Sequence, residues 1–364
     1  MRAMIMAAGL GTRLWPLTGL IPKPMVPILN RPALYHILRL LRDHGVTKVV
    51  MNLHHFPDTV TSYFADGEWM GMELSYALEE RLLGTAGGVK NNEEFLGEGT
   101  FLVMSGDALA DIDLTALVSA HKATGALATL AVKEIEDPSL YGVVVTDTEG
   151  RIAGFQEKPS REQALSHLCN CGIYVFEPAV FDHIPSGSFY DFGSRLFPEL
   201  LAAGERIYAH SVSGYWNDVG NLLEYRRGSF DALAGRVRIE MPGREIEPGV
   251  WIGERTFVAP TVAMQAPVLI GADCRIEENV VLEGPLVMGD QSLIEHDSSL
   301  HRAISWDGLF LGEGCRLADT VMGRSVHVRG RVQADGAVLG ERSLIGYGRN
   351  LGARVLKPRS VVWK

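Results

Sequence analysis

The sequence predicts an α/β layered fold followed by a parallel β-helix, and two different periodicities along the chain predict it. Over roughly the first 230 residues, strand-like apolar runs alternate with helix-like amphipathic runs, which is typical of a largely parallel sheet covered by helices. After about residue 245, aliphatic residues recur every six positions. A six-residue period fits neither a helix nor a hairpin array, and it indicates short strands lining a prism.

The composition limits the classes of molecule that the chain is expected to bind. The chain has 364 residues, with 34 Lys and Arg against 44 Asp and Glu, and a formal net charge of −10. The length suggests about two domains. The acidic balance disfavours nucleic-acid and membrane binding, which would need a basic face. No run reaches the roughly 18–20 apolar residues of a membrane span. We therefore expect neither a nucleic-acid partner nor a membrane partner.

The first half contains the elements of the predicted sheet. A signal peptide is an alternative for the apolar start, but the run is short and continues into a Gly-rich loop, so a buried first strand is favoured. The predicted strands are Arg2–Ala7, Lys48–Asn52, Glu73–Leu78, Phe101–Ser105 and Ala126–Val132. The amphipathic pattern of Ala33–His44 predicts a helix that Gly45 ends. Tyr141–Val145 and Arg151–Gln156 are expected to form a hairpin.

The second half contains the hexapeptide repeat. Its uninterrupted aliphatic row comprises Ile252, Val258, Met264, Ile270, Ile276, Leu282, Met288, Ile294 and Leu300. The phase slips near Trp306, and the repeat resumes at Leu311. We predict a first domain at residues 1–235, a linker at 236–249 and the β-helix at 250–364. Four cysteines (Cys169, Cys171, Cys274 and Cys315) are expected to be reduced thiols of a cytoplasmic protein.

A Gly-rich loop follows the first strand and is suited to phosphate. Gly9 and Gly11 allow close backbone approach and aim N–H groups at an anion. Arg13 and Lys23 add cationic donors, and the prolines on either side of Lys23 fix its segment. The loop is not a Walker motif, because no Gly-Lys-Ser/Thr follows. It is not a full dinucleotide fingerprint either, because a leucine replaces the third glycine.

Five motifs and the repeat together resemble one enzyme family. The motifs are Ala7–Leu14, Ser105–Asp107, Glu157–Pro159, Asn170–Gly172 and Trp216–Gly220. Over nearly the whole chain the sequence resembles the sugar-1-phosphate nucleotidylyltransferases, especially the branch that includes mannose-1-phosphate guanylyltransferases. The resemblance implies a Rossmann-like nucleotidyltransferase domain with a mixed, mostly parallel sheet, followed by a left-handed β-helix. It also implies transfer of a nucleotidyl group from a nucleoside triphosphate (NTP) to a sugar 1-phosphate, with release of pyrophosphate.

This chemistry needs charge neutralisation and alignment more than a strong base. Mg²⁺ suits it, because that ion binds through one or two carboxylates plus substrate phosphates. Asp107 follows a buried strand, where α/β sheets place ligands, and Asp218 stands at a second strand-to-turn position. Both match the family's metal-binding aspartates. Of Asp111 and Asp113, we expect one to cap a helix.

The resemblance assigns the remaining site residues. The catalytic residues it implies are Arg13, Lys23, Asp107 and Lys158. Those expected at the nucleotide are Ala8, Gly9, Gly11, Thr12, Arg13, Gly84, Thr85, Gly88 and Asp107. Those expected at the sugar phosphate are Gly142, Glu157, Lys158, Asn170 and Gly172. Asp191 is a weaker candidate, as either a sugar contact or a structural residue.

Several alternatives stay open from the sequence. The Leu-Gly-Thr-Ala-Gly segment at residues 83–87 resembles guanylyl-type members, so GTP is favoured over dTTP or UTP, and mannose or glucose 1-phosphate is expected as acceptor. A non-catalytic regulatory homologue that senses sugar nucleotides is the alternative from another class. For the β-helix we expect a role in homo-oligomer formation. An acyltransferase role through His296, His301 or His327 is the minor alternative.

Overall fold

The computed structural model describes residues 1–363, which pack as two units. The first unit contains residues 1–10 and 34–218, and the second contains residues 11–33 and those from Val219 onward. The domain boundaries predicted at residues 235 and 250 are placed where the sequence repeat begins, whereas these two units are defined by packing. The predicted boundaries stay a prediction. Within the described residues, none of the helices has the length and apolar character to cross a membrane.

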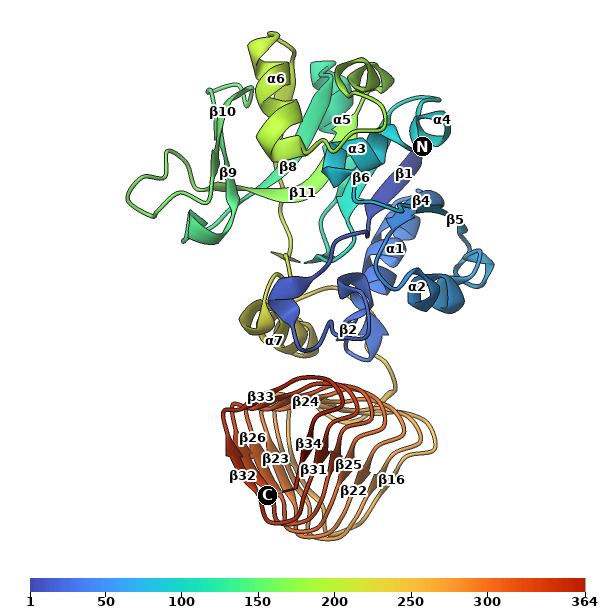
Figure 1. The fold of residues 1–364 in the computed structure, drawn as a ribbon, viewed down its shortest axis with the longest axis vertical. Coiled ribbons are helices and arrows are strands. Elements are labelled where there is room, and N and C mark those ends of the chain that lie inside the picture. The colour runs from blue at the N-terminus through green and yellow to red at the C-terminus, as the bar shows by residue number, and fades with distance from the viewer. Residues whose placement is uncertain (364) are drawn as a thin grey trace. The chain divides into compact units, whose positions relative to one another are not determined.

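A nine-stranded mixed sheet forms the centre of the first unit (Figure 1). Strands β6, β1, β4 and β5 run parallel in that order, and β11 joins β6 antiparallel. The strands are β1 (Arg2–Met6), β4 (Lys48–Leu53), β5 (Glu73–Leu78), β6 (Phe101–Ser105), β8 (Ala128–Glu134), β9 (Gly142–Thr146), β10 (Ile152–Glu157), β11 (Leu168–Phe176) and β12 (Ile207–Ser211). This arrangement confirms the predicted fold class, although β11 was absent from the predicted strands.

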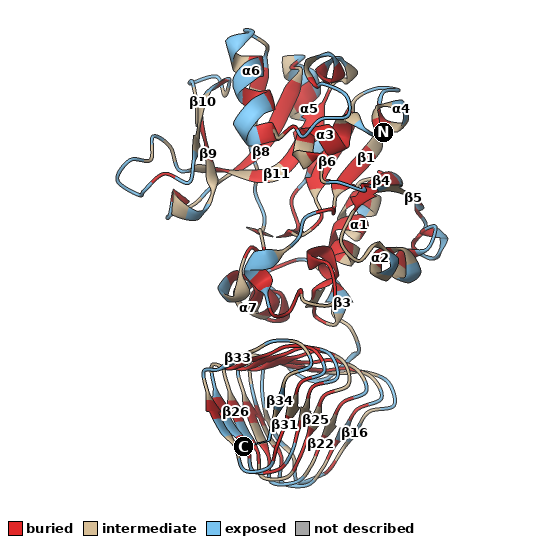
Figure 2. Ribbon diagram, viewed as in Figure 1, coloured by how far each residue is buried: buried red, intermediate tan, exposed pale blue. Residues whose placement is uncertain are grey.

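The helices alternate with the strands as the amphipathic runs predict. They are α1 (Ala33–Asp43), α2 (Pro57–Phe64), α3 (Gly84–Lys90), α4 (Glu93–Leu96), α5 (Leu114–Thr124), α6 (Phe197–Ala202) and α7 (Leu222–Leu233). In α1, the side chains of Leu34, Leu38 and Leu41 are fully buried, which explains its spacing of apolar residues. Figure 2 shows buried residues concentrated along the central strands. In β1, Met4 and Ile5 are fully buried.

Two short antiparallel ribbons stand apart from the main sheet. The first pairs β7 (Leu109–Ala110) with β13 (Trp216–Asn217) in the first unit. The second pairs β2 (Pro27–Ile28) with β3 (Arg31–Pro32) in the second unit. Each ribbon belongs to a segment in which the sequence places candidate ligands.

The hexapeptide repeat forms three faces of short parallel strands, consistent with the predicted left-handed β-helix. Face 1 comprises β15 (Val250–Ile252), β18 (Val268–Ile270), β21 (Leu286–Met288), β24 (Ile304–Ser305), β27 (Val321–Met322), β30 (Val338–Leu339) and β33 (Val355–Leu356), with β14 (Arg244–Glu247) antiparallel at its start. Face 2 comprises β16 (Phe257–Val258), β19 (Arg275–Ile276), β22 (Leu293–Ile294), β25 (Phe310–Leu311), β28 (His327–Val328), β31 (Leu344–Ile345) and β34 (Val361–Val362). Face 3 comprises β17 (Ala263–Gln265), β20 (Val281–Glu283), β23 (Ser299–His301), β26 (Arg316–Ala318), β29 (Gln333–Asp335) and β32 (Asn350–Gly352).

The phase slip near Trp306 has a simple structural cause. Val268 pairs with Leu286, so the early coils contain 18 residues. Val287 pairs with Ile304, and Ile304 with Val321, so each later coil is one residue shorter than the early coils. The shortening falls in a turn and keeps the interior positions aligned, so the aliphatic row stays buried on both sides of the slip.

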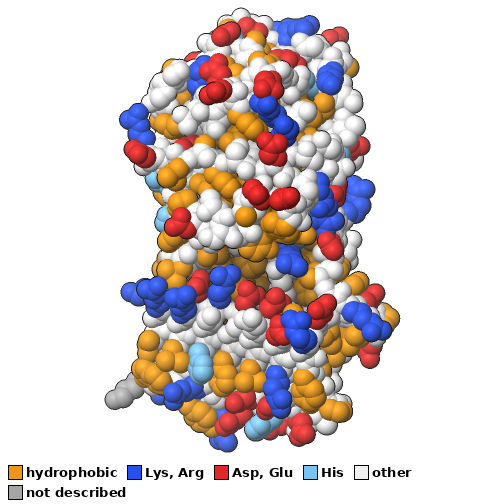
Figure 3. All heavy atoms as spheres, turned by 90° about the vertical axis from the view of Figure 1, so that its right-hand side faces the viewer, with side chains coloured by type: hydrophobic (Ala, Val, Ile, Leu, Met, Phe, Trp, Pro, Cys, Tyr) orange, Lys and Arg blue, Asp and Glu red, His pale blue; other side chains and the backbone are white. Residues whose placement is uncertain are grey.

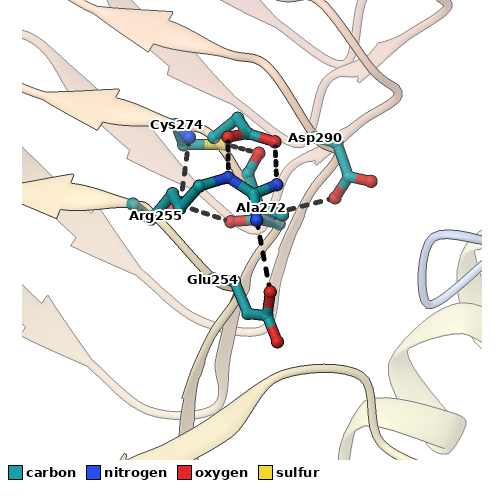
Figure 4. A network of polar contacts seen from close by, with 8 residues as sticks. Glu254, Arg255, Ala272, Cys274 and Asp290 are labelled. Atoms are coloured by element: carbon teal, nitrogen blue, oxygen red, sulfur yellow. Dashed lines mark hydrogen bonds and ion pairs between the residues drawn. The ribbon is translucent and has the colours of Figure 1, made fainter.

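Side chains in the turns between coils satisfy backbone groups of the neighbouring coil (Figure 4). The amide of Ala272 donates to Asp290 Oδ1 at 2.8 Å, and the amide of Asp290 donates to Asp307 Oδ1 at 3.1 Å. Arg255 donates from Nε and Nη2 to both carboxylate oxygens of Asp273, at 2.6 and 2.7 Å. Such bonds fix the corners, where tight turns leave amides without a strand partner.

Candidate active site

The β7–β13 ribbon brings Asp107 and Asp218 to one place. Its register pairs Asn217 with Leu109. Asp218 therefore leaves β13 at the end where the chain enters β7 from Asp107. Opposite residues of an antiparallel pair lie about 5 Å apart, so two carboxylates from positions far apart in the sequence share one end of a ribbon. Both side chains are partly exposed, which leaves them accessible to a ligand.

The other two aspartates of this segment have structural roles. Asp113 is the N-cap of α5, and its Oδ1 accepts from the amide of Ala116 at 2.9 Å, which confirms the expected helix cap. Asp111 Oδ1 accepts from the amide of Tyr215 at 2.6 Å, and the amide of Asp111 donates to the Tyr215 carbonyl at 3.1 Å. Asp111 therefore extends the ribbon that carries Asp107.

An irregularity in β11 places Asn170 and Gly172 beside the end of β6. The pairing of β11 with β8 shifts between Asn170 and Tyr174. Gly172 has a φ of +70°, and a Cβ there would stand 3.2 Å from Cβ of Ser105. Asn170 Oδ1 accepts from the Gly172 amide at 3.0 Å, which fixes this turn. Ser105 Oγ in turn donates to Asp107, so the β11 irregularity and the acidic ribbon adjoin.

The β9–β10 hairpin brings together Gly142, Glu157 and Lys158. Gly142 pairs with Glu157, and the Lys158 Nζ lies 3.3 Å from the Glu157 carboxylate, with both side chains exposed. The Lys158 amide donates to the carbonyl of Tyr141 at 3.0 Å. The Tyr141 ring packs 5.6 Å from that of Trp216, the first residue of β13. The predicted sugar-phosphate residues thus connect through aromatic packing to the Asp218 strand.

Two of these positions have unfavourable backbone angles. Lys158 has a φ of 45°, and Val219, directly after Asp218, has a φ of 44°. The left-handed region is disfavoured for side chains with a Cβ, and most of all for a β-branched residue such as valine. Strain of this kind costs about 1–3 kcal/mol.

The second Gly-rich segment packs against the segment that contains Asp191. Thr85 Oγ1 donates to Asp191 Oδ2 at 2.9 Å and accepts from the Phe192 amide at 2.7 Å. Asp191 also caps the short helix Phe192–Leu196, so it has a structural role. A Cβ at Gly84 would stand 2.5 Å from the carbonyl oxygen of Tyr190, which explains the glycine there.

A buried Asn52–Glu79 pair links the two Gly-rich segments, and sequence reasoning missed it. Asn52 Nδ2 donates to Glu79 Oε1 at 2.8 Å, and both side chains are nearly inaccessible. Asn52 Oδ1 accepts from the Ala7 amide at 2.8 Å, and Glu79 Oε2 from the Leu83 amide at 3.1 Å. A Cβ at Gly88 would stand 2.8 Å from both partners, so that glycine makes room for the pair. The sequence signal that could have revealed this pair was a polar residue at the end of each of two adjacent strands.

Arg13 and Lys23 belong to the second unit, in the segment from Gly11 to Ala33, which we call the signature segment. Gly11 has a φ of +63°, and a Cβ there would stand 2.7 Å from Cβ of Lys23. Thr18 Oγ1 donates to the Gly11 carbonyl at 2.9 Å. Thr12 and Arg13 are exposed in a short 3-10 helix, whereas Lys23 is largely buried. Ala8 and Gly9 lie at the end of the first unit's β1 loop.

The donor set fits a hard cation that completes its coordination with substrate oxygens. Among residues 1–363, no group of three or more His, Cys, Asp or Glu side chains could hold a metal ion. Two carboxylates at one end of the β7–β13 ribbon are the donors that Mg²⁺ uses together with phosphates and water. The ribbon therefore fits Mg²⁺ better than Zn²⁺, which prefers three or four protein ligands.

The cysteines near this site are structural. All four are free and buried. Burial, with a smaller effect of the Asp218 carboxylate, raises the pKa of the Cys169 thiol to about 12. Burial likewise raises the pKa of Cys171 well above its ordinary value. Both thiols stay protonated near neutral pH, so neither is a nucleophile.

Comparison with known proteins gives consistent results. Residues 2–234 match the family described as "Nucleotidyl transferase". The chain is 41% identical to a UTP–glucose-1-phosphate uridylyltransferase of Synechocystis over 88% of this chain and 87% of that protein. It is 32% identical to a mannose-1-phosphate guanylyltransferase of Mycobacterium tuberculosis over 86% and 82%. A Bacillus anthracis structure titled as a putative glucose-1-phosphate thymidylyltransferase matches with a TM-score of 0.59, at 24% identity, over 66% of this chain and 96% of that one.

Proposed function

This chain belongs to the nucleotidyl transferase family, and we propose that it transfers a nucleotidyl group from an NTP to a hexose 1-phosphate, releasing pyrophosphate and forming a sugar nucleotide. The observation that carries the proposal is the β7–β13 register, which joins Asp107 and Asp218 next to the β11 irregularity. The named relatives support this acceptor and donor class.

The charge of each candidate residue indicates which part of the substrates it would bind. The phosphate oxygen of the sugar attacks the α-phosphorus, and pyrophosphate leaves in line. We assign Lys158 to the attacking phosphate, and Glu157, Asn170 and the backbones of Gly142 and Gly172 to the sugar. Arg13 and Lys23 stabilise negative charge on the leaving pyrophosphate, and the backbone amides of the Gly-rich loop orient it.

Asp107 and Asp218 would hold Mg²⁺, which neutralises phosphate charge when bound. The protein's own contribution is to keep the two carboxylates close together and oriented. The Ser105 hydroxyl donates to Asp107, and the backbone bonds between Asp111 and Tyr215 extend the ribbon. These contacts fix the acidic pair before substrate arrives.

Two substrate pairs remain candidates, because different observations favour each. The Leu-Gly-Thr-Ala-Gly segment favours GTP, with mannose 1-phosphate as acceptor. The relative with 41% identity acts, by its name, on UTP and glucose 1-phosphate, which makes that pair the second candidate. The two hexoses differ at one hydroxyl, and a site with directed polar groups discriminates such a difference strongly.

The test is a pyrophosphate-release panel that crosses GTP, UTP, dTTP and ATP with mannose 1-phosphate and glucose 1-phosphate. We expect release with at least one pair and none when Mg²⁺ is replaced by a chelator. The Asp107→Asn variant serves as the matched negative control. Absence of release with every pair, together with measurable binding of a sugar nucleotide, would favour the regulatory homologue instead.

The four buried free thiols support a reducing compartment, so we propose a cytoplasmic location.

We also propose that face 2 of the β-helix joins two copies of the chain. Its outward column is Phe257, Arg275, Leu293, Phe310, His327, Leu344 and Val361. Five of these seven are apolar, and the terminal pair is 50% and 55% exposed. Figure 3, which views the β-helix from the side of β16, β22 and β25, shows apolar side chains among charges of both signs.

An antiparallel two-fold arrangement centred on Phe310 would place Glu295 of one copy near Arg329 of the other, and Asp273 near Arg342. Burial, followed by the charge of Arg329, lowers the pKa of His327, which keeps its ring neutral where it stacks on Phe310 at 4.1 Å. By sedimentation, Phe310→Asp should reduce the mass of the assembly, whereas Gln333→Asp on face 3 should not. Equal masses for both variants would contradict this interface.

A further inference from the structure

The signature segment belongs to the same compact unit as helix α7 and the β-helix. Residues 11–33 form one compact unit with everything from Val219 onward. The contacts responsible come from helix α7 and from the corner between faces 1 and 2 of the β-helix. This unit joins parts of the chain that are far apart in the sequence. The β-helix is therefore in a position to support the predicted phosphate-binding segment.

A buried hydrogen-bond relay connects the two. Tyr225 of α7 is fully buried, and its hydroxyl donates to the carbonyl of Pro27 at 2.9 Å. The same hydroxyl accepts from Trp306 Nε1 at 2.8 Å. Trp306 directly follows β24 on face 1 and is almost inaccessible. A phenol has a single O–H, so one tyrosine completes both bonds and the relay runs from Trp306 through Tyr225 to Pro27.

Two further contacts hold the segment on either side of the relay. Asn30 Nδ2 donates to the carbonyl of Met288 on β21 at 2.8 Å. Gly19 lies so close to Pro358 that an added Cβ would stand 2.5 Å from the proline Cγ. These two contacts and the relay reach three different coils of the β-helix, so the segment is fixed along its length.

Bonds inside the segment transmit this fixation to the predicted phosphate ligands. Pro27 begins the β2–β3 ribbon only four residues after Lys23. The Val26 amide donates to the Lys23 carbonyl at 3.1 Å, and Lys23 packs directly on Gly11. A displacement of Pro27 would therefore move both Lys23 and the Gly-rich loop.

We propose that Tyr225 and Trp306 are positioning residues for the triphosphate, through which the β-helix holds Lys23 and the Gly-rich loop in their binding geometry. The inference rests on the proposed function, because it takes pyrophosphate as the group that the signature segment binds. It gives the β-helix a role in NTP binding that is separate from any role in assembly.

The test compares Tyr225→Phe and Trp306→Phe with Trp251→Phe, which removes an indole from face 1 outside the relay. In full-length protein, both relay variants should raise the KM for NTP and, in the reverse reaction, for pyrophosphate by about fivefold. The KM for the sugar 1-phosphate should stay within about twofold, because that subsite lies on the sheet of the first unit. The control variant should leave all three constants unchanged.

A second measurement does not depend on activity. Arg13 is exposed and followed by leucine, so trypsin cleavage after Arg13 reports how firmly the segment is held. Both relay variants should be cut there several times faster than wild type or Trp251→Phe. Lower thermal stability with unchanged KM ratios and unchanged cleavage would overturn the inference and leave Tyr225 as a core residue. Failure of wild type to release pyrophosphate would overturn the proposed function, and the cleavage rates would still decide the relay.

Discussion

The candidate ligands on the sheet and those on the signature segment are supported in different ways. On the sheet, backbone pairing holds Asp107, Asp218 and Asn170 near strand ends, in the β7–β13 ribbon and the β11 irregularity. In the signature segment, the Tyr225 side chain of α7 holds the Pro27 backbone, and the segment's own Asn30 side chain bonds to the backbone of β21. The comparison teaches that the acidic pair depends on local register, whereas the cationic loop depends on residues some two hundred positions away in sequence.

The largest effect should come from removing a charge without disturbing the register. Asp107→Asn keeps the size of the side chain and loses its anionic metal ligand. We expect kcat to fall by about a hundredfold to a thousandfold, corresponding to several kcal/mol of lost charge stabilisation. The melting temperature should stay close to that of wild type. Unchanged turnover in steady-state pyrophosphate release would remove Asp107 from the site.

The buried Asn52–Glu79 pair should be the most sensitive structural position of the first unit. Glu79→Gln replaces a buried acceptor of two hydrogen bonds and should lower the free energy of unfolding by about 1–3 kcal/mol. Glu73→Gln, at the start of the β5 strand that Glu79 directly follows, is the matched control, because its partner Lys48 is exposed and such pairs contribute about 0–1 kcal/mol. Denaturant unfolding measures both, and equal effects would contradict a bridging role for Glu79.

A substitution at Lys158 can distinguish the effect of backbone strain on stability from the effect of the side chain on substrate binding. Lys158→Asn introduces a residue that tolerates the left-handed region, so the free energy of unfolding should stay equal or rise by about 1 kcal/mol. The KM for the sugar 1-phosphate should rise about tenfold, because a charged contact to phosphate is lost. Arg359→Asn, at a similar φ of 60° on the β-helix, should change stability in the same direction and leave KM unaltered. A drop in stability in Lys158→Asn with unchanged KM would make Lys158 a structural residue.

The smallest effect should come from the helix cap beside the acidic pair. Asp113→Ala removes the cap of α5 and should cost about 1 kcal/mol of stability with kcat unchanged. Thermal unfolding and pyrophosphate release measure the two quantities. A large loss of kcat in this variant would extend the acidic site beyond Asp107 and Asp218.

The sequence predicted much of the fold because its signals are local. Alternation of apolar residues located β5 and β6 with their observed bounds, and the six-residue period located the interior of the β-helix. It missed β11, whose polar residues Asn170 and Gly172 interrupt the apolar pattern where the strand becomes irregular. The Asn52–Glu79 pair was also missed, because a lone polar residue at a strand end carries no spacing that reveals its partner.

For the candidate site, the sequence by itself determined the chemical inventory: two aspartates after strands, a cationic Gly-rich loop and a Glu-Lys pair at a hairpin end. Only the tertiary structure decided which groups meet. Pairing of β7 with β13 joined Asp107 to Asp218 across more than a hundred residues, and Tyr225 tied Pro27 to Trp306. The physical reason is that a periodic pattern reports which face of an element is buried, whereas the partner of that face is chosen by long-range packing and register.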